Sequence, residues 1–184
     1  SSTQATVNPG LNVTTNAQEV CLGTTLMISS TPSGGTPAYT YIWAGPNGFS
    51  ASTQNITRNN AALNMSGTYS ITVTDTKGCT GVSSVVATVN PGLNVVTNAP
   101  EVCEGSTLNI SSTPSGGTAG YTYIWSGPNG FTAATQNITR NNATVNMSGN
   151  YSVTVTDTKG CTGTSSTSAV VNPNPTLQAS SNSP

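Results

Sequence analysis

Residues 66–79 read Ser-Gly-Thr-Tyr-Ser-Ile-Thr-Val-Thr-Asp-Thr-Lys-Gly-Cys, and this stretch decides the fold class. In its middle, Tyr69, Ile71 and Val73 alternate with hydroxyl-bearing residues. Successive side chains of a strand point to opposite faces, so the alternation predicts a strand with one face in a core and the other in water. Residues 75–78 have the composition of a tight turn, which predicts that the chain then reverses into another strand.

The same stretch returns as residues 148–161, with the sequence SGNYSVTVTDTKGC. Around it, residues 9–90 and 91–172 align without a gap and differ at 18 of 82 positions. A repeat of this kind predicts two tandem domains with those boundaries. Residues 1–8 match the end of the repeat and residues 173–184 resemble its beginning. We therefore expect the last strand of a preceding repeat at 1–8 and the first strand of a following one at 173–184.

The composition excludes several classes of function. Charged residues make up 5% of the chain, there is no histidine, and the formal net charge is −1. Nucleic-acid binding needs clustered Lys and Arg, and acid–base catalysis most often uses histidine, so we expect neither a nucleic-acid partner nor an enzyme with catalytic residues. No cofactor is expected. No apolar run is long enough to predict a membrane span in these residues.

The order of the features resembles that of the immunoglobulin fold, an all-β sandwich. Trp43 falls where such domains carry the core tryptophan, and residues 66–69 resemble the tyrosine corner. Ile28 and Ile71 stand where the two core cysteines of an antibody domain would be, so an apolar contact is expected to replace that disulfide. The corresponding residues of the second repeat are Trp125, Tyr151, Ile110 and Val153. Arg58 and Arg140 are expected at the surface.

Four runs are similar to immunoglobulin-like repeats of large Bacteroidota surface proteins, such as adhesins and gliding-motility proteins of the SprB kind. They are YIWAGPNGF (41–49), TQNITRNNA (53–61), SGTYSITVTDTKGCTG (66–81) and VNPG (89–92). The resemblance implies a stalk or adhesive segment of an exported protein. Only residues 90–92, which include a proline, connect the repeats. Because proline restricts bending, we expect two immunoglobulin-like sandwiches in an extended head-to-tail rod.

The four cysteines are Cys21, Cys79, Cys103 and Cys161, in matching positions of the two repeats. This even count predicts disulfides in an oxidising, extracellular setting, with buried free thiols as the alternative. A metal site is not expected, because histidine and a Cys-x-x-Cys pair are both absent.

The pairing of these cysteines is left open between two schemes. Pairs within each repeat, Cys21 with Cys79 and Cys103 with Cys161, are the simplest. In immunoglobulin topology, however, Cys21 is expected at the start of the second strand, at the opposite end of the sandwich from Cys79. Such a separation is roughly 23 Å, whereas a disulfide needs Cα atoms within about 7 Å. We slightly favour Cys21 with Cys161 across the junction, with Cys79 and Cys103 bonding the preceding and following repeats in the same way.

Glycosylation and partners remain expectations. Eight asparagines stand in Asn-x-Ser/Thr sequons, only slightly more than this composition gives by chance. We rank Asn55 and Asn137 first, and the others are Asn12, Asn64, Asn109, Asn142, Asn146 and Asn150. The expected function is a structural part of an extracellular bacterial surface filament or adhesin stalk, with neighbouring copies or repeats, and glycans, as the expected partners. The alternatives are an adhesive module that recognises a glycan or protein through its loops, and donor-strand assembly through residues 1–8.

Overall fold

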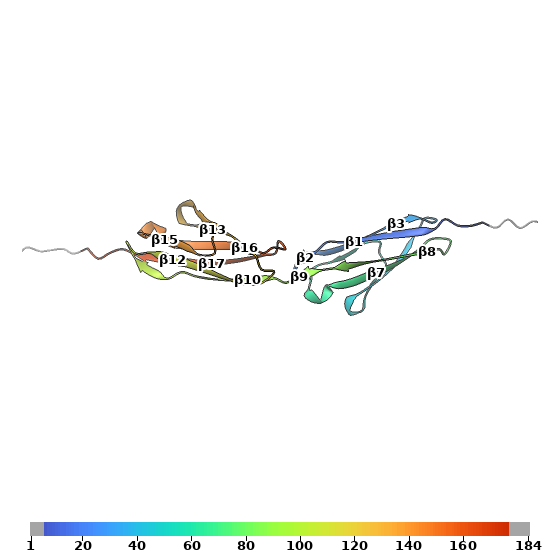
Figure 1. The fold of residues 1–184 in the computed structure, drawn as a ribbon, viewed down its shortest axis with the longest axis horizontal. Coiled ribbons are helices and arrows are strands. Elements are labelled where there is room, and N and C mark those ends of the chain that lie inside the picture. The colour runs from blue at the N-terminus through green and yellow to red at the C-terminus, as the bar shows by residue number, and fades with distance from the viewer. Residues whose placement is uncertain (1–5, 177–184) are drawn as a thin grey trace, which may run out of the picture. The chain divides into compact units, whose positions relative to one another are not determined.

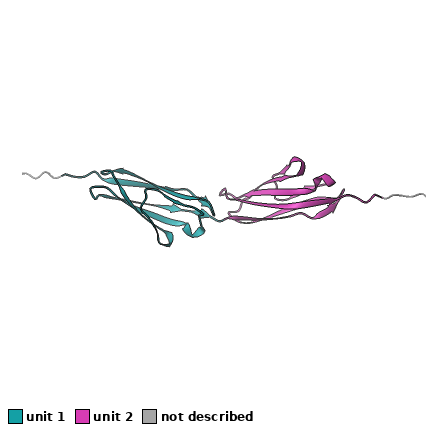
Figure 2. Cartoon of the chain, turned by 180° about the vertical axis from the view of Figure 1, so that it is seen from behind, with its two compact units in different colours: residues 1–91 teal, residues 92–184 magenta. Residues whose placement is uncertain are grey.

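A computed structural model describes residues 6–176, which form two compact units, Ser1–Pro91 and Gly92–Pro184 (Figure 2). Regular structure in both units consists of strands and four short 3-10 turns. Of the two terminal strands expected from the sequence, residues 6–8 and 173–176 are described, and they lie outside strands. The remainder of those two segments lies outside the described residues.

The first unit consists of two antiparallel sheets (Figure 1). Its strands are β1 (Leu11–Ala17), β2 (Val20–Cys21), β3 (Leu26–Gly34), β4 (Thr40–Gly45), β5 (Phe49–Ala51), β6 (Ile56–Arg58), β7 (Gly67–Thr74), β8 (Thr80–Ala87) and β9 (Val89–Asn90). One sheet has the order β1-β3-β6 and the other β5-β4-β7-β8. The short strand β2 pairs in parallel with β9, the last strand of the unit.

The second unit repeats this arrangement. Its strands are β10 (Leu93–Asn98), β11 (Glu101–Cys103), β12 (Leu108–Gly116), β13 (Thr122–Gly127), β14 (Phe131–Ala133), β15 (Ile138–Arg140), β16 (Gly149–Thr156) and β17 (Thr162–Asn172). The sheets have the orders β10-β12-β15 and β11-β17-β16-β13-β14. The four 3-10 turns are η1 (Pro46–Gly48), η2 (Leu63–Met65), η3 (Pro128–Gly130) and η4 (Val145–Met147).

The alternation in residues 66–79 places one face of β7 in the core, as predicted. Tyr69, Ile71 and Val73 are all buried, and Trp43 of β4 lies opposite Ile71 in the ladder. Ile28 of β3 is buried in the same cluster. The two positions that would carry a core disulfide in an antibody domain are thus filled by packed aliphatic side chains, which confirms the prediction for both repeats. In each unit a three-stranded sheet and a sheet of four or five strands enclose this core. The two units are therefore immunoglobulin-like sandwiches.

The buried hydroxyl of Tyr69 connects three parts of the first unit. It donates to the carbonyl oxygen of Met65 at 3.0 Å, which is the bond of a tyrosine corner. Arg58 at the end of β6 donates to the same hydroxyl at 2.6 Å, and its guanidinium lies 4.6 Å from the ring centroid of Phe49. Arg58 is therefore half-buried in a hydrogen-bonded and cation–π contact, so the expectation of a plain surface residue is wrong. Arg140 makes the same contacts with Tyr151 and Phe131.

Gly45 is required for the position of the tyrosine ring. A Cβ at this residue would lie 2.6 Å from two carbons of the Tyr69 ring, a distance that side chains do not tolerate. Gly127 has the same relation to Tyr151 in the second unit. The ring therefore packs directly on the backbone of the neighbouring strand.

Removal of the two buried hydroxyls should destabilise both sandwiches. The double variant Tyr69→Phe/Tyr151→Phe leaves a carbonyl oxygen and a guanidinium N–H without their partner in each unit. We expect a loss of about 1–3 kcal/mol in the free energy of unfolding per unit, measured by urea denaturation. The matched control is Tyr41→Phe/Tyr123→Phe, whose hydroxyls have no hydrogen bond among the described residues. A control as destabilised as the test variant would contradict this assignment.

Candidate functional site: the cysteine-bearing poles of each repeat

Each sandwich has two poles, and the N-terminal pole is the end at which the chain enters it. In the first unit this pole contains the turn between β7 and β8. Asp75 at the start of the turn is only 5% exposed. Its Oδ1 accepts from the backbone N–H groups of Lys77 at 2.9 Å and Cys79 at 2.8 Å, while Oδ2 accepts from that of Thr36 at 2.8 Å. The carboxylate therefore fixes the backbone position of Cys79.

The second unit has the same arrangement around Asp157. This carboxylate accepts from the N–H groups of Thr118 at 2.8 Å, Lys159 at 2.9 Å and Cys161 at 2.8 Å. The N–H donors, with that of Thr36 foremost, lower the pKa of Asp75. Burial would raise the pKa of Asp157, but the N–H donors outweigh it and the pKa is lowered as well. Both carboxylates are thus stabilised in the charged form.

The C-terminal pole of each unit is the end at which the chain leaves it. Cys21 lies in β2, and its ladder partner is Asn90, the last residue of β9. The next residue, Leu22, donates its N–H to the carbonyl oxygen of Asn90 at 2.9 Å. In the second unit Cys103 is likewise the ladder partner of Asn172. Cys21 was expected at the start of the second long strand, but it lies in a separate two-residue strand ahead of β3.

The two cysteines of one repeat lie at opposite poles. In the first unit about ten residues of extended chain separate Thr80, next to Cys79, from Asn90, next to Cys21. In the second unit the single strand β17, of 11 residues, separates the same positions. At about 3.3 Å per residue, each separation is roughly 33 Å. Cα atoms joined by a disulfide lie within about 7 Å, so a bond between the two cysteines of one repeat does not fit either unit.

The four cysteines also differ in chemical state. Cys21 and Cys161 are disulfide-bonded, whereas Cys79 and Cys103 carry free thiols. Cys161 is 2% exposed, Cys21 and Cys79 are half-buried, and Cys103 is exposed. The two bonded cysteines come from opposite poles, one at the C-terminal pole of the first unit and one at the N-terminal pole of the second.

All eight sequon asparagines are exposed: Asn12, Asn55, Asn64, Asn109, Asn137, Asn142, Asn146 and Asn150. The two ranked first also have a structural role. The side-chain oxygen of Asn55 accepts from the backbone N–H of Ser30 at 3.1 Å, and Asn137 does the same for Ser112. Ser30 belongs to β3 and Ser112 to β12, and both lie past the residues that pair with β6 and β15. The asparagine side chains therefore satisfy strand N–H groups that have no ladder partner on that side. Whether any of these asparagines carries a sugar stays a prediction.

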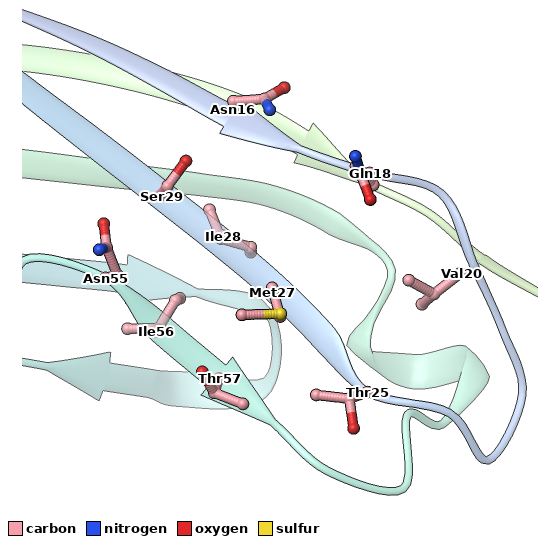
Figure 3. A pocket seen from close by; sticks show the side chains of 10 residues that line it. All are labelled: Asn16, Gln18, Val20, Thr25, Met27, Ile28, Ser29, Asn55, Ile56 and Thr57. Carbon is pink, nitrogen blue, oxygen red and sulfur yellow. The ribbon is translucent and has the colours of Figure 1, made fainter.

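A pocket of about 300 Å³ lies on the first unit beside the β1-β3-β6 sheet (Figure 3). It is lined by Asn16, Gln18, Val20, Thr25, Met27, Ile28, Ser29, Asn55, Ile56 and Thr57. These side chains carry amide, hydroxyl and aliphatic groups and the thioether of Met27, with no aromatic ring and no charge. Met27 is 65% exposed, and its equivalent in the second repeat is Asn109. Gln18 and Met27 are thus two lining residues that the second repeat replaces, by Pro100 and Asn109.

In residues 6–176, no three His, Cys, Asp or Glu side chains are grouped so that they could hold a metal ion. The described residues also contain no helix of the length and hydropathy needed to cross a membrane.

No protein-family model matches the sequence, and no curated protein matches it. Among solved structures, the I-band fragment I67–I69 of titin gives a TM-score of 0.55 at 16% identity, over 92% of this chain and 67% of that one. Three N-terminal domains of the Highly Immunogenic Outer Capsid protein of bacteriophage RB49 give 0.45 at 20% identity, over 89% of this chain and 59% of that one. An amphioxus IgVJ-C2 molecule gives 0.41 at 16% identity, over 82% of this chain and 98% of that one. The titin similarity supports the immunoglobulin-like fold.

The two buried aspartates should make stability depend on acid pH. Their folded pKa lies below the ordinary value of 3.8, so the stabilisation is present above that value and is lost as the pH falls through the folded pKa. We expect the urea midpoint of the chain to fall below about pH 4. The midpoint of Asp75→Asn/Asp157→Asn should be lower at pH 7 and flatter towards acid pH.

The control for this experiment is Glu104→Gln, whose side chain has no hydrogen bond among the described residues. It removes one carboxylate without touching either N-terminal pole, so its pH profile should follow that of the unmodified chain. An aspartate variant with the unmodified midpoint and pH profile would show that the Asp75 and Asp157 bonds do not stabilise the fold.

Proposed function

We propose that this chain is a structural segment of an extracellular bacterial surface filament or adhesin stalk built from tandem immunoglobulin-like repeats. The observation that carries the proposal is the path of the chain through each sandwich. The chain enters at the N-terminal pole and leaves at the C-terminal pole, and Pro91 and Gly92 alone lie between β9 and β10. A further repeat can therefore be added by continuing the chain, without any segment that returns along the sandwich.

The near identity of the repeats also favours a structural role. The 18 differing positions of 82 leave the core, the tyrosine corner and the aspartate turn unchanged in kind. Repeats that contact only their neighbours add stability and length in equal steps, which suits a stalk. A dedicated recognition site is expected to differ from one copy to the next, and the pocket-lining positions Gln18 and Met27 are among the few that do differ.

Several features support the extracellular bacterial assignment. The repeats resemble those of Bacteroidota surface proteins in the runs given above, and disulfide-bonded cysteines are typical of exported proteins. The strands present serine and threonine on their outer faces, and all eight sequon asparagines are exposed. Glycans at such positions would add solubility to a surface with few charges.

The rival function is an adhesive module that recognises a glycan or protein through its loops. The pocket on the first unit supports this rival function, because amide and hydroxyl groups line the pocket. Electron microscopy of native material distinguishes the two functions. A regular fibre supports the stalk, whereas compact particles that bind a defined glycan on an array support the module.

The length of recombinant chains should grow in proportion to the number of repeats. We expect chains of two, four and eight repeats, measured by small-angle X-ray scattering, to add roughly 40 Å per repeat, the length of an 11-residue strand and a short linker. A flexible string would instead grow approximately as the square root of the repeat number. Square-root growth would contradict a stiff stalk. Replacement of Pro91 by Gly offers a matched control, which should move the growth towards the flexible case.

A further inference from the structure

The cysteine of the C-terminal pole lies beside the residue at which the chain leaves its sandwich. Cys21 pairs in the ladder with Asn90, and Asn90 is followed by Pro91 and Gly92. Neighbouring strands are about 4.8 Å apart, so Cys21 lies at the start of the linker to the next repeat. Its distance from the linker is set within the first unit alone.

The cysteine of the N-terminal pole lies beside the residues at which the chain enters its sandwich. Gly163, two residues after Cys161, packs on the first strand of its unit, and a Cβ there would lie 2.7 Å from the carbonyl oxygen of Leu93. Asn90 and Leu93 are three residue steps apart, at most about 11 Å of chain. Cys21 and Cys161 therefore flank the two ends of one short linker.

We propose that the cysteines cross-link each repeat to the next, the C-terminal-pole cysteine of one repeat bonding the N-terminal-pole cysteine of the repeat that follows. In this chain the bond joins Cys21 to Cys161. Cys79 and Cys103 are the two unmatched halves of the same joint, and each takes a further repeat of the same kind as its partner. This cross-link rests on the proposed tandem array and is the covalent contact between its repeats.

The chemical states of the cysteines fit this scheme. Cys21 and Cys161, the pair that one linker brings together, are disulfide-bonded, whereas Cys79 and Cys103 are free thiols. The separation of roughly 33 Å within each sandwich removes the competing partner.

Each new bond needs an oxidant. Two thiols lose two protons and two electrons as the sulfur–sulfur bond forms, and a small disulfide such as oxidised glutathione accepts them as it is cleaved to two thiols. The Asp75 and Asp157 bonds hold the backbone of the N-terminal-pole cysteines in place during this exchange.

Tryptic mapping without reduction tests the bond in the intact chain. Cleavage after Arg58, Lys77, Arg140 and Lys159 puts Cys21 in peptide 1–58, Cys161 in peptide 160–184, and Cys79 with Cys103 in peptide 78–140. We expect 1–58 linked to 160–184, with 78–140 unlinked. Cys79→Ser should leave this link unchanged, and Cys21→Ser should abolish it. A link from 78–140 to either of the other two peptides, or no link at all, overturns the proposal.

Counting free thiols in denaturant tests the scheme as repeats are added. Each added repeat brings two cysteines and one new joint, so the count should stay at two, as for Cys79 and Cys103 here, when further copies of residues 91–172 are appended. Pairing within repeats would give none, and unpaired cysteines would give two more with every repeat. Either result would contradict the proposed cross-link. The growth of length with repeat number does not depend on the cysteines, so a failed thiol count leaves the stalk function standing.

A second copy of this chain and a further repeat in the same chain offer the same chemistry, and oxidation separates them. With oxidised glutathione at high protein concentration, the unmodified chain should form a ladder of disulfide-linked multimers. Cys79→Ser and Cys103→Ser should each remain monomeric alone and form dimers when mixed. Dimers of either variant with itself would overturn pairing between opposite poles. If the chain forms no ladder but keeps two free thiols when repeats are appended, the partner of each free cysteine is a further repeat of the same chain.

Discussion

The two sheets of each sandwich hold together by apolar packing around a tryptophan, with no covalent bond through the core. Ile28 and Ile71 occupy the positions of an antibody domain's disulfide, and Trp43 packs between the sheets in the same cluster. Because that contact is fully buried, it also fixes which face of every strand turns inward. The turns, the tyrosine corner and the positions of the cysteines all depend on this register.

Because aliphatic residues fill the core positions, no cysteine lies between the sheets of either sandwich. The four cysteines all lie at the poles, and each N-terminal-pole cysteine is positioned by a buried aspartate. The carboxylates of Asp75 and Asp157 each satisfy three backbone N–H groups, and these hydrogen bonds order the turns. The sandwich core therefore does not depend on any disulfide.

Much of this architecture could be predicted because the repeat and the strand alternation are strong signals. The period predicted two tandem repeats, and Tyr69, Ile71 and Trp43 are buried as their pattern indicated. Two features could not be predicted from the sequence. The two-residue strand that holds Cys21 is too short to show any alternation, and only its ladder with Asn90 reveals it. The burial of Arg58 depends on a tyrosine hydroxyl eleven residues away, a contact that spacing along one strand does not encode.

The parallel pairing of β2 with β9, and of β11 with β17, decides how a repeat carries load. Tension applied through the chain draws the first strands towards one pole and the last strand towards the other. The hydrogen bonds between them, such as those from Val20 to Thr88 and from Leu22 to Asn90, are then sheared together instead of being opened one after another. These bonds therefore bear load together, and even the shortest strands of a repeat contribute to its resistance to stretching.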